Sequence, residues 1–281
     1  MKTLTVGAAG YVGGVLYREA ARRGVARGTS STGRDGLLLL KLDDVGGFDF
    51  HQISPGEVVL FTAAVSAPDA CERDRIRATA INVTGTAEFI ERAMDRGARV
   101  IFLSSDAVYG ERETGVDEST VCKPTGGYAR MKFEIEQRFA GAQAFKAIRL
   151  SYVFSKEDKF TRYLIECWRN GIEADLFHPF LRAVIYRDDV VQGALELARR
   201  WQDFPMPALN FGGPAVLSRV DIAETLRCAC LPGLRLKVTE PAAEFFVNRP
   251  RVIAMKSPLL EELLGRPPLA LREAARNEFL L

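Results

Sequence analysis

A tyrosine and a lysine four positions apart, Tyr128 and Lys132, are the clearest candidates for acid–base chemistry in this sequence. In a helix such residues share one face, so the lysine ammonium can lie near the tyrosine phenol. A free phenol has a pKa of about 10, and a nearby cation favours the phenolate and lowers that pKa. The pair could therefore pass a proton to or from a substrate oxygen. The spacing alone also arises by chance, so its weight depends on the surrounding motifs.

A glycine-rich loop lies near the start of the sequence, between a strand-like run and a helical pattern. It reads Gly7-Ala-Ala-Gly10-Tyr11-Val12-Gly13-Gly14. Glycines permit a tight turn, let backbone N–H groups approach a pyrophosphate, and let the helix pack closely on the strand. The helix N-terminus adds a partial positive charge. The loop therefore predicts a dinucleotide site, and a tight turn without a ligand is the alternative.

The segment from Gly28 to Arg34 bears on which dinucleotide would bind. An NAD-specific site usually carries an acidic residue at the end of the second strand, about 20 residues after the loop. This sequence has small hydroxyl residues, including Ser31, and then Arg34. A guanidinium binds phosphate in a fork, so the segment favours NADP(H) over NAD(H). Asp35 and simple surface exposure of Arg34 are the opposing considerations.

The elements that must position these residues alternate between strand-like runs and helical patterns, which is typical of βαβ units. In the first half the strand-like runs are 4–6, 58–61, 99–103 and 147–150, and the helical patterns are 12–23, 70–96 and 128–140. In the second half the predicted helices are 159–170, 189–200 and 219–228, and the predicted strands are 183–186 and 208–211.

We therefore predict an α/β fold with a Rossmann-type, doubly wound parallel sheet and a smaller C-terminal α/β substrate lobe. Residues 1–150 are expected to form the NADP(H)-binding domain, and 151–281 mainly the substrate lobe. Elements at about 183–213 are expected to return to the Rossmann sheet.

Composition excludes several other classes of protein. The chain has 281 residues, 47% of them hydrophobic, and a formal net charge of +2 without a basic run, so we expect no nucleic-acid partner. We expect no signal peptide and no membrane span, because no apolar run reaches about 18 residues. Five cysteines without a CxxC pair and two histidines favour reduced thiols in a cytoplasmic protein and no metal site.

Together these motifs resemble the extended short-chain dehydrogenase/reductase family, which contains sugar-nucleotide epimerases, dehydratases and ketoreductases. The resemblance rests on the glycine loop, on Ser104-Ser105-Asp106-Ala107-Val108-Tyr109-Gly110, and on the Tyr128/Lys132 pair. Further similar segments span nearly the whole chain: 63–64, 81–86, 187–191, 209–214 and 218–219. Arg249-Pro250-Arg251 followed by 259–265 is similar to the tail of dTDP-4-dehydrorhamnose reductases.

The resemblance implies roles for individual residues. Tyr128 would give a proton to a carbonyl oxygen while the nicotinamide gives hydride to its carbon, Lys132 would also hold the nicotinamide ribose, and Ser105 would hydrogen-bond the same oxygen. Asp43 would lie beside the adenine, and Ala63, Ala64 and Ser104 would lie along the cofactor. The expected substrate contacts are Asp106, Ser151, Arg182 and Arg251. Lys159 and Arg162 are further candidates for a diphosphate. Asp43 and each of these cations are also compatible with solvated surface charges.

The resemblance also limits which reactions of the family are expected for this chain. Dehydratases of the family carry Thr-Asp-Glu where this chain has Ser105-Asp106-Ala107, so the base for dehydration is missing. We therefore predict NADPH-dependent reduction of a keto group on a nucleotide-linked deoxysugar. An NAD-dependent epimerase and a non-catalytic, cofactor-binding regulatory subunit are the alternatives. Gly126-Gly127 before the tyrosine departs from the family pattern, and a homodimer is expected by analogy alone.

Overall fold

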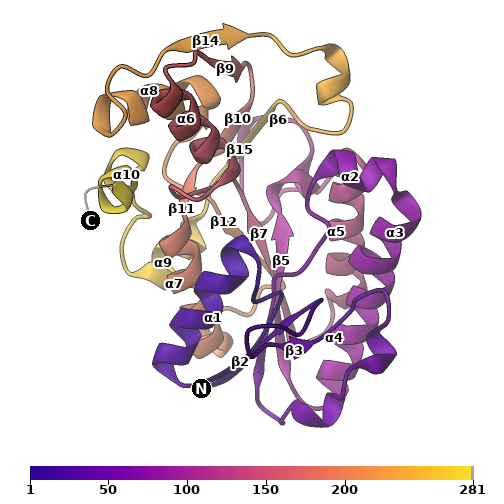
Figure 1. Cartoon of the computed structure of the whole chain (residues 1–281). Helices are drawn as coiled ribbons and strands as arrows, with labels where there is room; N and C mark the ends of the chain where they lie inside the picture. Colours follow the sequence, from indigo (N-terminus) through magenta and orange to yellow (C-terminus); the bar gives the residue numbers. More distant parts are fainter. Residues whose placement is uncertain (280–281) are drawn as a thin grey trace.

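The computed structural model describes residues 1–279 and shows an α/β fold built around one large parallel sheet (Figure 1). Its seven strands are β1 (Lys2–Val6), β2 (Val25–Ser30), β3 (Leu38–Leu39), β4 (Val58–Phe61), β5 (Arg99–Ser105), β7 (Phe145–Leu150) and β12 (Ala208–Phe211). Their spatial order is β3-β2-β1-β4-β5-β7-β12, and all neighbours are parallel. The predicted Rossmann-type sheet is confirmed.

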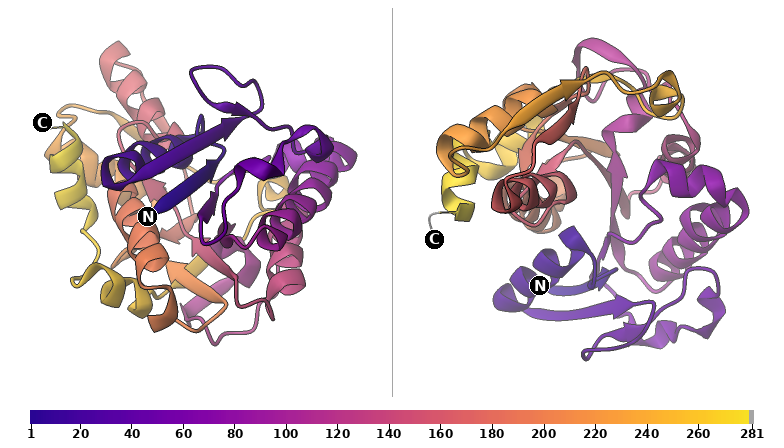
Figure 2. Two further views of the ribbon diagram at one scale, coloured as in Figure 1. Left: turned by 90° about the horizontal axis from the view of Figure 1, so that it is seen from below. Right: turned by 45° about the horizontal axis from the view of Figure 1, so that its top comes forward.

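Helices cover both faces of this sheet, which explains why its central strands are almost wholly buried (Figure 2). One face packs against α1 (Tyr11–Arg23), α7 (Arg187–Arg199) and α9 (Pro258–Leu264). The other face packs against α4 (Thr86–Asp95) and α5 (Gly127–Phe139). The alternation of strand and helix along the chain therefore produces three layers, with parallel strand ends at one edge.

The predicted helix over 70–96 is instead a series of shorter pieces. They are α2 (Pro68–Arg73), α3 (Arg75–Thr79), a π-helical turn (Ala80–Gly85) and α4. The chain breaks at Asp74, which has φ −133° and ψ 72°. Further on, the Asn82 side chain accepts from the Val65 N–H at 2.8 Å and donates to its carbonyl at 3.0 Å. Contacts with a distant loop thus override the local helical pattern.

A smaller lobe lies beyond the carboxyl ends of the large sheet. It contains the four-stranded sheet β13-β10-β15-β6 and the pairs β11-β8 and β14-β9. The strands are β6 (Arg112–Val116), β8 (Val153–Phe154), β9 (Ala174–Phe177), β10 (Leu181–Ala183), β11 (Ile185–Tyr186), β13 (Val216–Ser218), β14 (Leu236–Thr239) and β15 (Val252–Met255). Its helices are α6 (Lys159–Asn170), α8 (Arg219–Ala229) and α10 (Leu271–Phe279). The short 3₁₀ turns of the chain are 45–47, 50–52, 106–109, 201–203 and 243–246.

The predicted strand 183–186 is divided between β10 and β11, which pair in different sheets. The Val184 N–H between them donates to the Ala215 carbonyl, so the chain changes partners there. The chain then returns to the large sheet, where α7 covers one face and β12 forms the edge. Residues 280 and 281 of the predicted lobe lie outside the described residues.

Within residues 1–279, no helix is long and apolar enough to cross a membrane. In the same range no group of histidine, cysteine, aspartate and glutamate side chains could hold a metal ion. The five cysteines are unpaired in the structure.

Candidate active site

Two clefts meet at Tyr128, at the carboxyl ends of the parallel strands. The large cleft has a volume of about 880 Å³ and lies over the glycine loop and the ends of β1, β2, β4 and β5. The small cleft has a volume of about 310 Å³ and lies between the end of β5 and the smaller lobe. Tyr128 lines both clefts. Ligands of doubly wound sheets bind at this edge, so this junction is the candidate active site.

The glycine loop forms one wall of the large cleft in a conformation that side chains would block. Gly7 has φ +88°, a value that L-residues rarely adopt. A Cβ on Gly13 would overlap the carbonyl oxygen of Gly7 and the hydroxyl of Thr62. Gly10 caps α1 without a side-chain hydrogen bond, so the first N–H groups of this helix remain available to a ligand.

Most of the residues predicted for the cofactor line the large cleft: Gly7, Gly10, Tyr11, Val12, Gly13, Ser31, Asp43, Ala63, Ala64, Ser104, Tyr128 and Lys132. Ser104 is 4% exposed, and its hydroxyl has no hydrogen-bond partner within the described residues. A buried hydroxyl without a partner is costly, and a ligand in the cleft could supply one. Together with the uncapped start of α1, these residues fit a dinucleotide.

The structure does not bring Arg34 to the large cleft. The turn that carries it contains three residues with positive φ, Gly33, Asp35 and Gly36, and it leaves the Arg34 side chain exposed. Lys41 lines the cleft instead, on the segment that leads to Asp43. Lys41 was not predicted, because the phosphate contact was expected in the segment ending at Arg34. Its position two residues before Asp43, which was expected beside the adenine, could have indicated it.

Lys132 is buried beside Tyr128 on α5. Its ammonium donates a hydrogen bond to the Leu103 carbonyl at 2.7 Å and lies 4.4 Å from the centre of the Phe102 ring. The ammonium nitrogen lies 6.0 Å from the centre of the Tyr128 ring. Burial lowers the pKa of Lys132 to about 7, against the attraction of Glu136. The pair therefore shares one side of α5, as the four-residue spacing predicted.

The pKa of Tyr128 differs from the sequence expectation. Burial raises it above the ordinary phenol value, and the negative charge of Asp106 acts in the same direction. The expected lowering by Lys132 is not found: only a hydrogen bond with Ser105 lowers the pKa of Tyr128, and the unfavourable burial of a phenolate outweighs it. Without a bound ligand, Tyr128 is a protonated phenol and hence in the form of a proton donor.

Ser105 and Asp106 form the floor of the small cleft. The Asp106 carboxylate accepts hydrogen bonds from Ser151 at 2.8 Å and from Ser105 at 3.3 Å. Its oxygen lies 3.6 Å from the Arg182 guanidinium. Burial raises the pKa of Asp106, while Arg182 and the two hydroxyls oppose that shift. The structure thus brings together four of the predicted residues, Ser105, Asp106 and Ser151 through hydrogen bonds and Arg182 through an ion pair.

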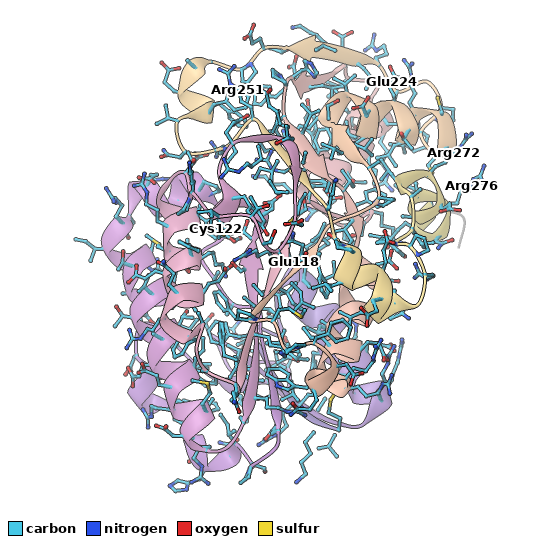
Figure 3. All side chains as sticks on the ribbon, turned by 180° about the vertical axis from the view of Figure 1, so that it is seen from behind. Glu118, Cys122, Glu224, Arg251, Arg272 and Arg276 are labelled. Atoms are coloured by element: carbon cyan, nitrogen blue, oxygen red, sulfur yellow. The ribbon has the colours of Figure 1, made fainter. Side chains whose placement is uncertain are left out.

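Two predicted phosphate ligands have other contacts. Arg182 lines the small cleft, but its guanidinium donates to the carbonyls of Leu181, Pro250 and Arg251. Arg251 lies in the smaller lobe, outside both clefts, with its guanidinium 4.7 Å from the centre of the Phe246 ring (Figure 3). Arg249, two positions earlier, lines the small cleft instead. Residues 247–250 form a turn and bend before β15, so the alternation of a strand does not apply there, and the sequence could not show which of the two arginines reaches the cleft.

The parallel sheet, the glycine-rich first turn and the Tyr/Lys pair beside the strand ends define a class, the extended short-chain dehydrogenases/reductases. The chain belongs, within this class, to the family described as the RmlD substrate binding domain, whose model matches residues 1–277. The resemblance inferred from the motifs is confirmed.

Two curated relatives are dTDP-4-dehydrorhamnose reductases. The protein of Sinorhizobium fredii is 28% identical over 147 residues, which is 51% of this chain and 50% of the relative. The protein of Mycobacterium tuberculosis is 29% identical over 164 residues, which is 55% of this chain and 51% of the relative. The chain therefore spans about half the length of the curated relatives it matches.

Solved structures share the fold over nearly the whole chain. A hypothetical dTDP-4-dehydrorhamnose reductase from Sulfolobus tokodaii has a TM-score of 0.83 at 20% identity, with 96% of this chain and 98% of that chain covered. A mutant UDP-glucuronic acid 4-epimerase from Bacillus cereus, in complex with UDP-4-deoxy-4-fluoro-glucuronic acid and NAD, has a TM-score of 0.83 at 17% identity. Here 99% of this chain and 98% of that chain are covered. At these identities the similarity concerns the fold alone.

Proposed function

We propose that this protein is an NADPH-dependent oxidoreductase that reduces a keto group on a nucleotide-linked deoxysugar. The observation that carries the proposal is the position of Tyr128, a protonated phenol at the junction of a large cleft suited to a dinucleotide and a small cleft lined by polar groups. The family and the names of the curated relatives support a keto-sugar nucleotide as substrate.

The large cleft would hold the cofactor. The free N–H groups at the start of α1 would bind the pyrophosphate, and Ser104 and Lys132 would bind the nicotinamide end. When bound, the reduced nicotinamide supplies a hydride for the carbonyl carbon. We assign residues 1–150 to this task and 151–281 mainly to substrate binding, with the part at about 183–213 that includes α7 and β12 completing the sheet.

The chain's own residues would handle the proton. Tyr128 would donate its phenolic proton to the carbonyl oxygen as negative charge develops there, and Ser105 would donate a hydrogen bond to the same oxygen. The buried ammonium of Lys132 would stabilise the phenolate that remains. Asp106 and Ser151 would orient the sugar hydroxyls. Arg182 and Arg249 line the same cleft and are the candidate cations for a diphosphate, which Arg249 would bind in place of Asp69.

The test is the variant Tyr128→Phe, assayed by NADPH oxidation with a panel of 4-keto sugar nucleotides that includes dTDP-4-dehydrorhamnose. We expect turnover to fall by roughly 10²–10⁴-fold, because the proton donor is lost, while NADPH binding stays within about twofold of wild type. The variant Tyr163→Phe changes a tyrosine outside both clefts and serves as the control. Near-normal turnover by Tyr128→Phe would remove the mechanism.

An NAD-dependent epimerase is the second candidate, and the exposure of Arg34 outside the large cleft favours it. Such an enzyme retains its cofactor, so nicotinamide that stays bound through purification would support it. The regulatory-subunit alternative requires no turnover, and the assembled Ser105, Tyr128 and Lys132 argue against it. A homodimer and a cytoplasmic location stay predictions.

A further inference from the structure

The double glycine before Tyr128 makes room for two contacts from distant parts of the chain. Gly126 has φ +82°, and a Cβ there would lie 2.6 Å from the Asn248 carbonyl oxygen. A Cβ on Gly127 would lie 2.6 Å from a carboxylate oxygen of Glu72. Side chains at these two positions would therefore push away a segment of the smaller lobe and a side chain of α2.

Glu72 takes the place of an N-cap side chain for α5, the helix that carries Tyr128 (the catalytic helix). Gly126 is the N-cap of α5 and has no side chain to accept a hydrogen bond. The Glu72 carboxylate of α2 accepts instead from the N–H of Gly127 at 2.7 Å. A carboxylate at a helix N-terminus satisfies an unpaired donor and interacts favourably with the helix dipole. Gly127 immediately precedes Tyr128, so this bond acts on the backbone that carries the phenol.

The same short helix is also tied to the smaller lobe. Asp69, three residues before Glu72, forms an ion pair at 2.5 Å with Arg249, and this contact lowers the pKa of Asp69. Arg249, Asn248 and Pro68 all line the small cleft. One face of α2 thus contacts both the wall of the small cleft and the first residue of the catalytic helix.

We propose that Glu72 is a positioning residue that holds the start of α5 and thereby sets the place of Tyr128 between the two clefts. The inference rests on the proposed function for its effect on turnover, because it assumes that Tyr128 donates the proton. The predicted effect of Glu72 on the start of α5 does not depend on the proposed function. Asp69 and Arg249 hold the opposite end of α2 against the lobe.

The experiment compares Glu72→Ala, which removes the acceptor, with Glu72→Gln, whose amide oxygen can still accept from Gly127. Glu134→Ala changes an exposed glutamate on α5 and is the matched control. Two readouts need no substrate: the rate of amide hydrogen exchange at Gly127 and the side-chain NMR signals of Tyr128. The Tyr128 signals are assigned as those that are missing from the spectrum of Tyr128→Phe. We expect Glu72→Ala to speed the exchange at least tenfold and to shift the Tyr128 signals. Glu72→Gln and Glu134→Ala should leave both unchanged.

Turnover of dTDP-4-dehydrorhamnose with NADPH is the third readout. We expect kcat to fall about tenfold in Glu72→Ala, with KM and NADPH affinity within about twofold of wild type, and to recover in Glu72→Gln. Unchanged exchange and unchanged Tyr128 signals in Glu72→Ala would overturn the inference, as would equal losses of kcat in the Ala and Gln variants. If the wild-type protein reduces no keto-sugar nucleotide, the proposed function fails, and the two NMR readouts still decide the role of Glu72.

Discussion

Lys132 lies with 3% of its surface exposed, between the Phe102 ring and the Leu103 carbonyl. Its pKa of about 7 in the folded protein compares with about 10.4 for a lysine in an unfolded chain. Between these two values the unfolded chain binds a proton that the folded protein does not, so stability rises with pH. Below pH 7 both states are protonated and the penalty for the buried charge is largest.

This burial predicts a pH-dependent difference between the wild type and Lys132→Met. The free energy of unfolding of the cofactor-free wild type should rise relative to the variant by up to about 1.4 kcal/mol per pH unit between pH 7 and 9. Urea unfolding of both proteins at pH 7, 8 and 9 measures it. The comparison cancels the titration of other groups, and parallel pH profiles would show that Lys132 stays charged in the folded protein.

Lys41 carries a second prediction at this scale. If the large cleft binds a 2′-phosphate through this residue, Lys41→Ala should weaken NADPH about tenfold and leave NADH almost unchanged, because only NADPH loses a charge-assisted contact. Titrations followed by nicotinamide fluorescence measure both affinities. Arg34→Ala is the comparison variant, and a selective loss of NADPH binding there would return the role to Arg34.

Among the elements, α1 and the loop before it depend most on the absence of side chains. Gly13→Ala should destabilise the protein by about 1–3 kcal/mol and weaken cofactor binding, because the new Cβ overlaps the Gly7 carbonyl and displaces the loop. Gly141→Ala is the matched control: its Cβ meets no atom within 4 Å, and it should be neutral or stabilising by up to about 1 kcal/mol. Thermal unfolding and nicotinamide titration measure the two effects. Equal behaviour of the variants would contradict the argument.

Elements with strong local patterns were predicted correctly from the sequence. Elements whose conformation depends on contacts with distant segments were not. The predicted bounds of α6 and β12 agree with the structure, since each combines a clear apolar pattern with local end signals such as the Asp158 cap. The π-helical turn 80–85 carries no local signal, and within it the Asn82 side chain is hydrogen-bonded to the distant Val65. The same holds for the site: its motif residues were predictable, whereas Glu72 and Arg249 depend on which segments meet.

At the scale of the whole molecule, a buried polar network connects the large sheet to the helix that carries Tyr128. Arg149 of β7 donates to Glu136 of α5 at 2.7 Å and to the Tyr109 hydroxyl at 2.8 Å, and Tyr109 donates to Asn210 of β12. The Asn210 N–H in turn donates to Glu118, which lies near the centre of the molecule in Figure 3. Five separate segments are therefore joined beneath the site: β7, α5, the turn 106–109, β12 and the loop that carries Glu118.

Removing one member should leave a buried charge without its partner. We expect Glu136→Ala to lower the free energy of unfolding by about 3–5 kcal/mol, because Arg149 is only 7% exposed. The double variant Glu136→Met/Arg149→Met should recover much of that loss, since it buries no charge. Urea unfolding of the three proteins measures both effects. A loss below about 1 kcal/mol in Glu136→Ala would indicate that water reaches Arg149.

The position of β12 at the edge of the large sheet also has a consequence during synthesis. The strand β12, which pairs with β7, is made about 60 residues later than β7. Helix α9, which packs on the same sheet face as α1 and α7, is made later still. At a synthesis rate of roughly 5–20 residues per second, the N-terminal half would remain for on the order of ten seconds with the edge of β7 unpaired and the face under α9 incompletely covered. The free edge of β7 and the sheet face that α9 covers are therefore the parts of the large sheet that stay exposed longest during synthesis.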